Sequence, residues 1–162
     1  MLQCRINGTI SHVMRFLTDK IKNLRIGWNE RPLTEADFYR LCRRFKVKVQ
    51  EMPLATGGFY YRVMGRDFIA VDSRLASVKK LFVLLHELGH FLFHTPESGE
   101  TANFHGVGRR TRKECEADVF ALCALIPISW IESRSPEALI DDEGFTAEMV
   151  VERLNILERY GM

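Results

Sequence analysis

The sequence lacks the marks of several protein classes. Its longest uninterrupted apolar run, from Ala121 to Ile128, is eight residues long and contains Pro127, whereas a membrane-spanning helix needs ~20 apolar residues. The four cysteines form no CxxC pair and are too few for a disulfide scaffold. Polar side chains interrupt residues 1–16, so they do not supply the apolar centre of a secretory signal. We therefore expect a cytoplasmic protein with reduced cysteines and no membrane span.

The composition is that of a folded domain. Of the 162 residues, 46% are hydrophobic and 27% are charged, which supplies enough apolar material for a core and differs from the composition of disordered chains. The charge is uneven, because residues 1–50 hold 11 Lys and Arg against 4 Asp and Glu, whereas residues 101–162 hold 7 against 11. A solvated helix face is the commoner origin of such a basic segment, so we expect no direct nucleic-acid binding.

Apolar residues at helical spacing predict two helices early in the chain. The first ends near Gly27 and carries one apolar face: Ile10, Val13, Met14, Leu17, Ile21 and Leu24. The second begins after Thr34, which forms a capping-box pattern with Asp37 three residues later. Its predicted buried stripe has the same spacing: Phe38, Leu41, Cys42 and Phe45. Both helices are therefore expected to be amphipathic.

A change to a period of two predicts strands in the next part of the chain. Val47 and Val49 alternate with polar residues, and the segments 59–63 and 68–71 flank a turn signal at residues 65–67. These segments predict a small three-stranded sheet, antiparallel or mixed. Together with the helices around it, the sheet indicates an α+β fold.

Four further helices are predicted in the rest of the chain. Residues 78–94 are apolar nearly all round, which is typical of a helix buried in the middle of a domain. A second apolar helix ends at Pro127, which cannot continue it. The Ser-Pro-Glu sequence at 135–137 starts a short helix, and Thr146 caps a final helix that ends at Gly161. The final helix is expected to bury one stripe: Val150, Leu154 and Leu157.

His86, Glu87 and His90 form an HExxH pattern on the predicted buried helix. Because His86 and His90 lie four residues apart, their imidazoles stack on one helix face about 6 Å apart along the axis and can bind one ion. Glu87 is rotated by about 100° and can reach water at that ion as a general base. The alternative, that these three residues are ordinary structural residues without a metal, is disfavoured, since each buried polar group would then need its own partner. The pattern therefore predicts a metal-dependent peptide hydrolase.

The third metal ligand has to come from another segment. A metzincin pattern, HExxHxxGxxH, would need Gly at position 93 and His at position 96, but the sequence has Phe93 and Pro96. His94 lies a further turn along the same helix and should point past an ion held by the first two histidines. We interpret His94 as a helix-end residue that interacts with terminal carbonyls.

The next helix offers two carboxylates on one face. At about 100° per residue, Glu114 and Asp118 project within about 40° of one another, whereas Glu116 lies about 200° away. We predict that Glu114 is the third ligand and that Asp118 accepts the N–H of a liganding imidazole. The alternative is a capping box in which Glu114 bonds the amide of Thr111, so that Glu116 or Cys115 would supply the ligand.

The segments HELGHFLFH at 86–94 and ECEADVFALCALIP at 114–127 together resemble the ImmA/IrrE family of zinc metallopeptidases. The likeness extends more loosely over residues 34–160. It implies a compact gluzincin-like metallopeptidase domain, in which the small sheet packs on the buried HExxH helix and the second motif helix. We accordingly place this domain at residues 31–162 and treat residues 1–30 as an N-terminal amphipathic helix that forms an appendage.

The resemblance also implies a site and a biological role. One zinc ion would be held by His86, His90 and Glu114, with Glu87 as the catalytic residue. Two imidazoles and a carboxylate suit zinc, and manganese or iron could take the same ligands. Family members act on helix-turn-helix repressors, often as site-specific proteases. We therefore expect a zinc-dependent endopeptidase of narrow specificity that cleaves a regulatory protein such as a helix-turn-helix repressor.

Three points are open in the sequence. The alternative function is a metal-stabilised binding module that inactivates a transcription repressor without proteolysis. The transition-state oxyanion needs a donor besides the metal, and His105 is the first candidate; the other competent donors are Arg109, Tyr60 and Tyr61. A basic cluster at the start of the second motif helix either binds acidic residues of a substrate or is simply exposed to solvent: Arg109, Arg110, Arg112 and Lys113.

Overall fold

The computed structural model describes residues 10–94, 101–102 and 111–162. These residues divide into two compact units. One unit comprises the described residues of 34–121, and the other the described residues of 1–33 together with residues 122–162. An appendage at residues 1–30 and a domain at residues 31–162 stay predictions.

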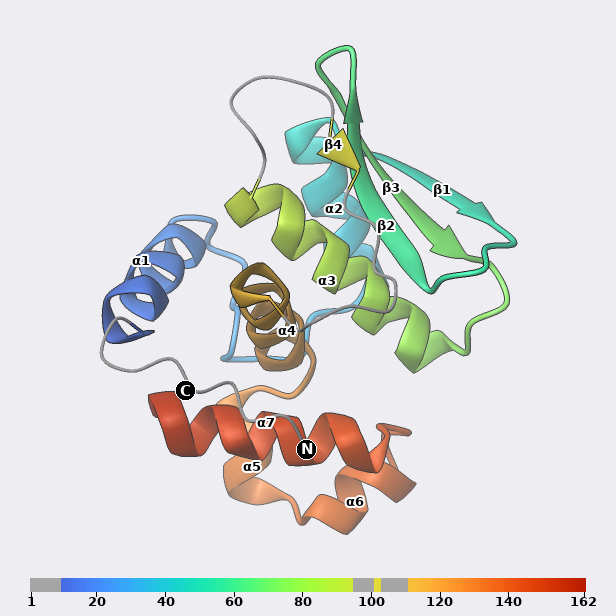
Figure 1. Ribbon diagram of the computed structural model, residues 1–162. Helices are drawn as coiled ribbons and strands as arrows, with labels where there is room; N and C mark the ends of the chain where they lie inside the picture. Colours follow the sequence, from blue (N-terminus) through green and yellow to red (C-terminus); the bar gives the residue numbers. More distant parts are fainter. Residues whose placement is uncertain (1–9, 95–100, 103–110) are drawn as a thin grey trace. The chain divides into compact units, whose positions relative to one another are not determined.

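The unit at residues 34–121 combines a sheet with helices (Figure 1). Its elements are α2 (Glu35–Phe45), β1 (Lys48–Met52), β2 (Gly58–Val63), β3 (Arg66–Asp72), α3 (Ser77–His94), β4 (Thr101–Ala102) and most of α4 (Arg112–Leu125). The predicted capping box of α2 is confirmed, since the Thr34 hydroxyl accepts the N–H of Asp37 and the Asp37 carboxylate accepts the N–H of Thr34. The helix buries most of its predicted stripe: Phe38, Leu41 and Cys42.

The sheet has the strand order β1-β3-β2-β4. β1 pairs with β3 in parallel, while β2 pairs antiparallel with both β3 and β4. The predicted three-stranded mixed sheet is thus confirmed, and the two-residue β4 extends it beside Tyr61 and Arg62. The turn predicted at residues 65–67 lies instead at Met64 and Gly65, whose φ angles of 49° and 71° are typical of a two-residue type I′ hairpin.

α3 lies against one face of the sheet (Figure 1) and carries the HExxH residues into the core. It packs against β2 and β3, and every residue from Leu84 to His90 is buried. Gly58 allows this close approach, since a Cβ there would lie 2.6 Å from Val83 Cγ1 and 2.7 Å from the carbonyl oxygen of Ala70. The lack of a side chain at Gly58 therefore determines how near β2 comes to the first half of α3.

α4 approaches α3 at a pair of small residues. A Cβ on Gly89 would lie 3.2 Å from the Cα of Ala117 and 3.3 Å from Cδ1 of Phe120. The two motif helices are thus close enough for side chains on both sides of this contact to meet. The predicted packing of the buried HExxH helix with a second motif helix is confirmed.

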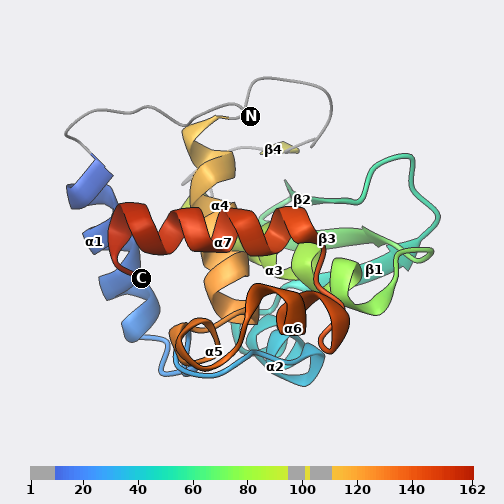
Figure 2. The same ribbon diagram turned by 90° about the horizontal axis from the view of Figure 1, so that it is seen from below.

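The other unit is helical in its described residues: α1 (Ile10–Lys22), α5 (Ile128–Ser133), α6 (Pro136–Asp141), α7 (Ala147–Tyr160) and the last turn of α4. Figure 2 shows α5 and α6 together along α7. The helices α1, α6 and α7 confirm the predictions, whereas α5 was missed. On α7 the predicted Val150 is buried, but Leu154 and Leu157 are half-buried, and Arg153 and Ile156 lie in the interior.

The described residues also bear on the cysteines and on membrane insertion. Among the described residues, Cys42, Cys115 and Cys123 form no disulfide, while Cys4 lies outside those residues. Burial raises the pKa of Cys42 to about 12 and that of Cys123 to about 11, so both stay protonated at neutral pH. Within the described ranges, no helix has the length and apolar character that crossing a membrane requires.

Candidate metal centre

Two imidazoles face one another on the buried stretch of α3. His86 and His90 lie one helical turn apart, and their Nε2 atoms are 3.2 Å apart. Both residues are buried, with 7% and 1% of their surface exposed. A tetrahedral ion bound at about 2.0–2.1 Å separates its ligand atoms by roughly 3.3 Å. The spacing of the two nitrogens therefore fits two ligands of one such ion.

α4 places Glu114 opposite this pair. Its Oε1 lies 3.3 Å from His90 Nε2, and its Oε2 lies 3.4 Å from His86 Nε2. Each residue thus offers one ligand atom, and these atoms lie within 4.8 Å of one another, so the three residues could hold a metal ion. The Thr111 hydroxyl accepts the backbone N–H of Glu114 at 3.3 Å. The helix-capping pattern and the approach of the Glu114 carboxylate to the histidines are therefore compatible.

Asp118, one turn after Glu114, lies behind His86. Its Oδ1 is 2.8 Å from His86 Nδ1. If Nδ1 donates its proton there, the lone pair of Nε2 points at the Glu114 carboxylate and His90. Burial lowers the pKa of His86, but hydrogen bonds to Asp118 and Glu114 outweigh it and raise that pKa to about 9. Burial lowers the pKa of His90.

Glu87 is buried beside the ligand cluster, with 1% of its surface exposed. Its Oε2 accepts the backbone N–H of Tyr60 on β2 at 2.8 Å. Together with Gly57 and Gly58, Glu87 lines a cavity of about 220 Å³. The carboxylate is thus held by the sheet at the wall of a cavity that His86 and Glu114 also line. This contact could not be predicted from the sequence, because a backbone N–H has no signal there.

His94 differs from its predicted role as a helix-end residue bonded to terminal carbonyls. Its Nδ1 lies 3.1 Å from His90 Nδ1, and its Nε2 lies 2.7 Å from Glu116 Oε2. Both ring nitrogens are thus engaged by side chains, so the prediction was wrong. The Arg112 Nε also donates to Glu116 Oε1 at 2.7 Å. Burial raises the pKa of Glu116, but the bonds from His94 and Arg112 outweigh it and lower that pKa.

The proposed oxyanion donors do not gather at the cluster within the described residues. His105, Arg109 and Arg110 lie outside those residues. The Tyr60 hydroxyl donates to Asp67 Oδ1 at 2.7 Å, and the Tyr61 hydroxyl donates to Gln50 Oε1 at 2.8 Å. Both tyrosines therefore hydrogen-bond to side chains of the sheet. Of the predicted basic cluster, Arg112 pairs with Glu116.

Comparison with known proteins identifies one family. The sequence model of the family Peptidase_M78, described as the IrrE N-terminal-like domain, matches residues 42–162. No curated protein and no solved structure matches the chain. The matched range contains both motif helices and the sheet, and it leaves residues 1–41 outside.

Proposed function

Since the chain belongs to the Peptidase_M78 family of IrrE N-terminal-like domains, we propose that it is a zinc-dependent endopeptidase of narrow specificity. The observation that carries this proposal is the cluster of His86, His90 and Glu114, whose ligand atoms have the spacing of a tetrahedral ion. Two imidazoles and one carboxylate leave one vertex for water or substrate, as catalytic zinc sites do and structural ones do not. A buried carboxylate, Glu87, lies next to this cluster.

The protein's own groups divide the chemistry among them. His86, His90 and Glu114 would hold the ion, and a bound zinc ion supplies a Lewis acid that polarises the peptide carbonyl and activates water. The Glu87 carboxylate would accept a proton from the attacking water and deliver it to the leaving amine. The N–H of Tyr60, bonded to Glu87 Oε2 at 2.8 Å, keeps that carboxylate in place during both transfers. Asp118 would hold His86 in the tautomer that leaves Nε2 able to bind the ion.

The start of β2, which lines the cavity beside the ligand residues, is the proposed binding surface for an extended substrate. Gly57 and Gly58 line the same cavity as His86 and Glu87. Within the described part of the chain, β4 pairs antiparallel with Tyr61 and Arg62 of the same strand. An extended peptide that adds to a sheet edge gains backbone hydrogen bonds and presents alternate side chains. We propose that a regulatory protein, by family resemblance a helix-turn-helix repressor, is cut there.

The test compares wild type with Glu87→Gln on a helix-turn-helix repressor encoded beside the gene. The Gln side chain keeps the size of Glu, and its amide oxygen can still accept the Tyr60 N–H, so the variant should fold and bind zinc. Intact-mass analysis should show cleavage at one bond by wild type and a loss of rate of about 10²–10⁴-fold in the variant. A repressor that loses DNA binding while staying intact with both proteins would contradict the proposal and favour a non-proteolytic binding module.

A further inference from the structure

Three histidines of α3 lie on one stripe, and the third is absent from the ligand cluster. His86, His90 and His94 are spaced four residues apart, so each lies one turn beyond the last. The side chains of His94 and Glu116 are buried, with 6% and 8% of their surface exposed. A buried imidazole and a buried carboxylate are costly unless they are paired. Because His94 contacts the proposed metal ligand His90, the pair of His94 and Glu116 can act on that ligand.

If His90 binds a metal through Nε2, the donor and acceptor roles of all ring nitrogens of His90 and His94 follow. The two Nδ1 atoms of His90 and His94 are 3.1 Å apart, so one of them donates and the other accepts. A metal ligand needs the lone pair of His90 at Nε2, which puts the proton of that ring on Nδ1. His94 then accepts at Nδ1 and carries its own proton on Nε2. That proton points at Glu116 Oε2, 2.7 Å away, so every ring nitrogen has a partner.

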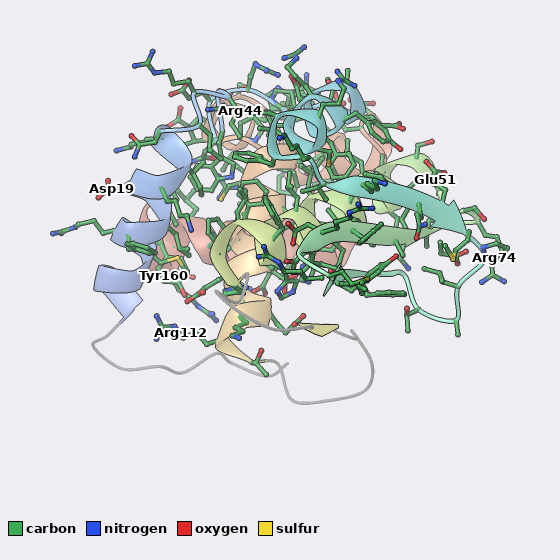
Figure 3. The ribbon with its side chains drawn as sticks, turned by 90° about the horizontal axis from the view of Figure 1, so that it is seen from above. Asp19, Arg44, Glu51, Arg74, Arg112 and Tyr160 are labelled. Atoms are coloured by element: carbon green, nitrogen blue, oxygen red, sulfur yellow. The ribbon has the colours of Figure 1, made fainter. Side chains whose placement is uncertain are left out.

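Arg112 completes the arrangement at the start of α4 (Figure 3). Its Nε donates to Glu116 Oε1 at 2.7 Å, which leaves Glu116 Oε2 for His94. The Arg112 side chain is 55% exposed, so solvent screens this ion pair and its contribution is small. We name His94, Glu116 and Arg112 the His94 network. Substituting a residue of this network should disturb the orientation of His90 most at His94, less at Glu116 and least at Arg112.

We propose that the His94 network is a positioning device that holds His90 as the Nδ1–H tautomer, with its Nε2 directed at the metal. This inference rests on the proposed function. His86 obtains the same support from a single carboxylate, since Asp118 Oδ1 lies 2.8 Å from its Nδ1. His90 lies one turn further along α3, and an extra imidazole spans the distance to Glu116. Partners that orient a metal-binding histidine in this way typically change metal affinity by about 10–100-fold.

The first experiment measures zinc affinity of the full-length chain by competition with a chromophoric chelator. His94→Leu removes both hydrogen bonds and should weaken zinc binding by about 10–100-fold. His94→Gln can accept from His90 and donate to Glu116, so it should recover most of that loss. Phe91→Leu is the control on the same helical turn, because its ring packs on Phe45 and Tyr60 instead. It should bind zinc like wild type.

The second experiment reads the tautomers directly and does not depend on activity. Long-range ¹H–¹⁵N spectra of the zinc-loaded wild type should show the proton of His90 on Nδ1 and that of His94 on Nε2. The visible spectrum of the cobalt-substituted protein should shift in His94→Leu and return toward wild type in His94→Gln. A proton on Nδ1 of His94, or equal zinc affinity in wild type and His94→Leu, would overturn the inference. A wild-type chain that binds no zinc would instead refute the proposed function on which it rests.

Discussion

Each of the two units buries a cluster of polar side chains, and the clusters differ in how their atoms are paired. In the helical unit, Arg153 has none of its surface exposed. It donates from Nε to the carbonyl oxygen of Ile126 at 2.7 Å, from Nη1 to that of Met162 at 2.6 Å, and from Nη2 to Asn29 Oδ1 at 2.9 Å. Each nitrogen of the cation thus donates to an oxygen within the unit, so donors and acceptors match in this cluster.

In the unit at residues 34–121, three candidate ligand groups face one another. The Nε2 atoms of His86 and His90 and the carboxylate of Glu114 lie 3.2–3.4 Å apart. If Asp118 and His94 take up the Nδ1 protons, these inner atoms are all lone pairs, and a proton or a cation is needed among them. A buried donor with matching acceptors stabilises a fold, whereas buried acceptors that face one another predict a ligand.

The largest effect that separates the two clusters is expected at Arg153. Arg153→Met removes three hydrogen bonds, to the backbone oxygens of Ile126 and Met162 and to Asn29 Oδ1, and should lower the free energy of unfolding by about 3–5 kcal/mol through lost hydrogen bonds and packing. Zinc affinity of the folded fraction should not change. Urea unfolding followed by circular dichroism measures the loss, with the exposed Arg159→Met on the same helix as control. A decrease in the free energy of unfolding below about 1 kcal/mol would contradict the idea that the Arg153 cluster stabilises the fold.

Glu114→Ala should have the opposite result: a loss of zinc affinity with little change in stability. It removes one of the three proposed ligands, so zinc affinity should fall by more than the ~100-fold upper value for a residue that only orients a ligand. The apo protein should unfold at nearly the wild-type temperature. Chelator competition and thermal unfolding check the two parts, and the exposed neighbour Lys113→Ala is the control. Unchanged zinc affinity would exclude Glu114 as a ligand.

A smaller effect is expected where the sheet meets α3. Gly58→Ala forces a Cβ to within 2.6 Å of Val83 Cγ1, and such overpacking costs about 1–3 kcal/mol. Because β2 also holds Glu87 through the Tyr60 N–H, peptidase activity should fall as well. Gly57→Ala is the matched control, since its Cβ would make ordinary contact at 3.4 Å. Equal stability of the two variants would contradict the tight contact at Gly58.

The smallest expected effect is a pH dependence of zinc binding. The pKa of His86 is raised to about 9, so below that pH the ring of the apo protein carries an extra proton that must leave before Nε2 can bind zinc. Zinc affinity should therefore rise by about tenfold per pH unit up to about pH 9 and then level off. Calorimetry at pH 7 in buffers of different ionisation enthalpy should count about one proton released. A count near zero would contradict this.

Much of the candidate site could be predicted from local periodicity. The positions of His86 and His90 four residues apart, and of Glu114 and Asp118 four apart, indicate two faces that can meet once both segments are helical. The structure brings those faces together. The prediction for His94 was wrong, because the direction of a helix-end side chain depends on which groups the neighbouring helix offers. The angle between Glu116 and Glu114 on α4 does not reveal that Glu116 meets His94.

The sequence by itself determined the described helices except α5, three strands of the sheet and the stripe of histidines, because helical and strand periods are local properties of the backbone. Only the tertiary structure decided that Glu87 bonds the Tyr60 N–H and that Glu116 bonds His94. It also decided that Arg153, at a position adjacent to the predicted stripe of α7, is buried among oxygens. These outcomes depend on how elements approach one another, through contacts such as Gly89 on Ala117, and no spacing within a single element specifies that approach.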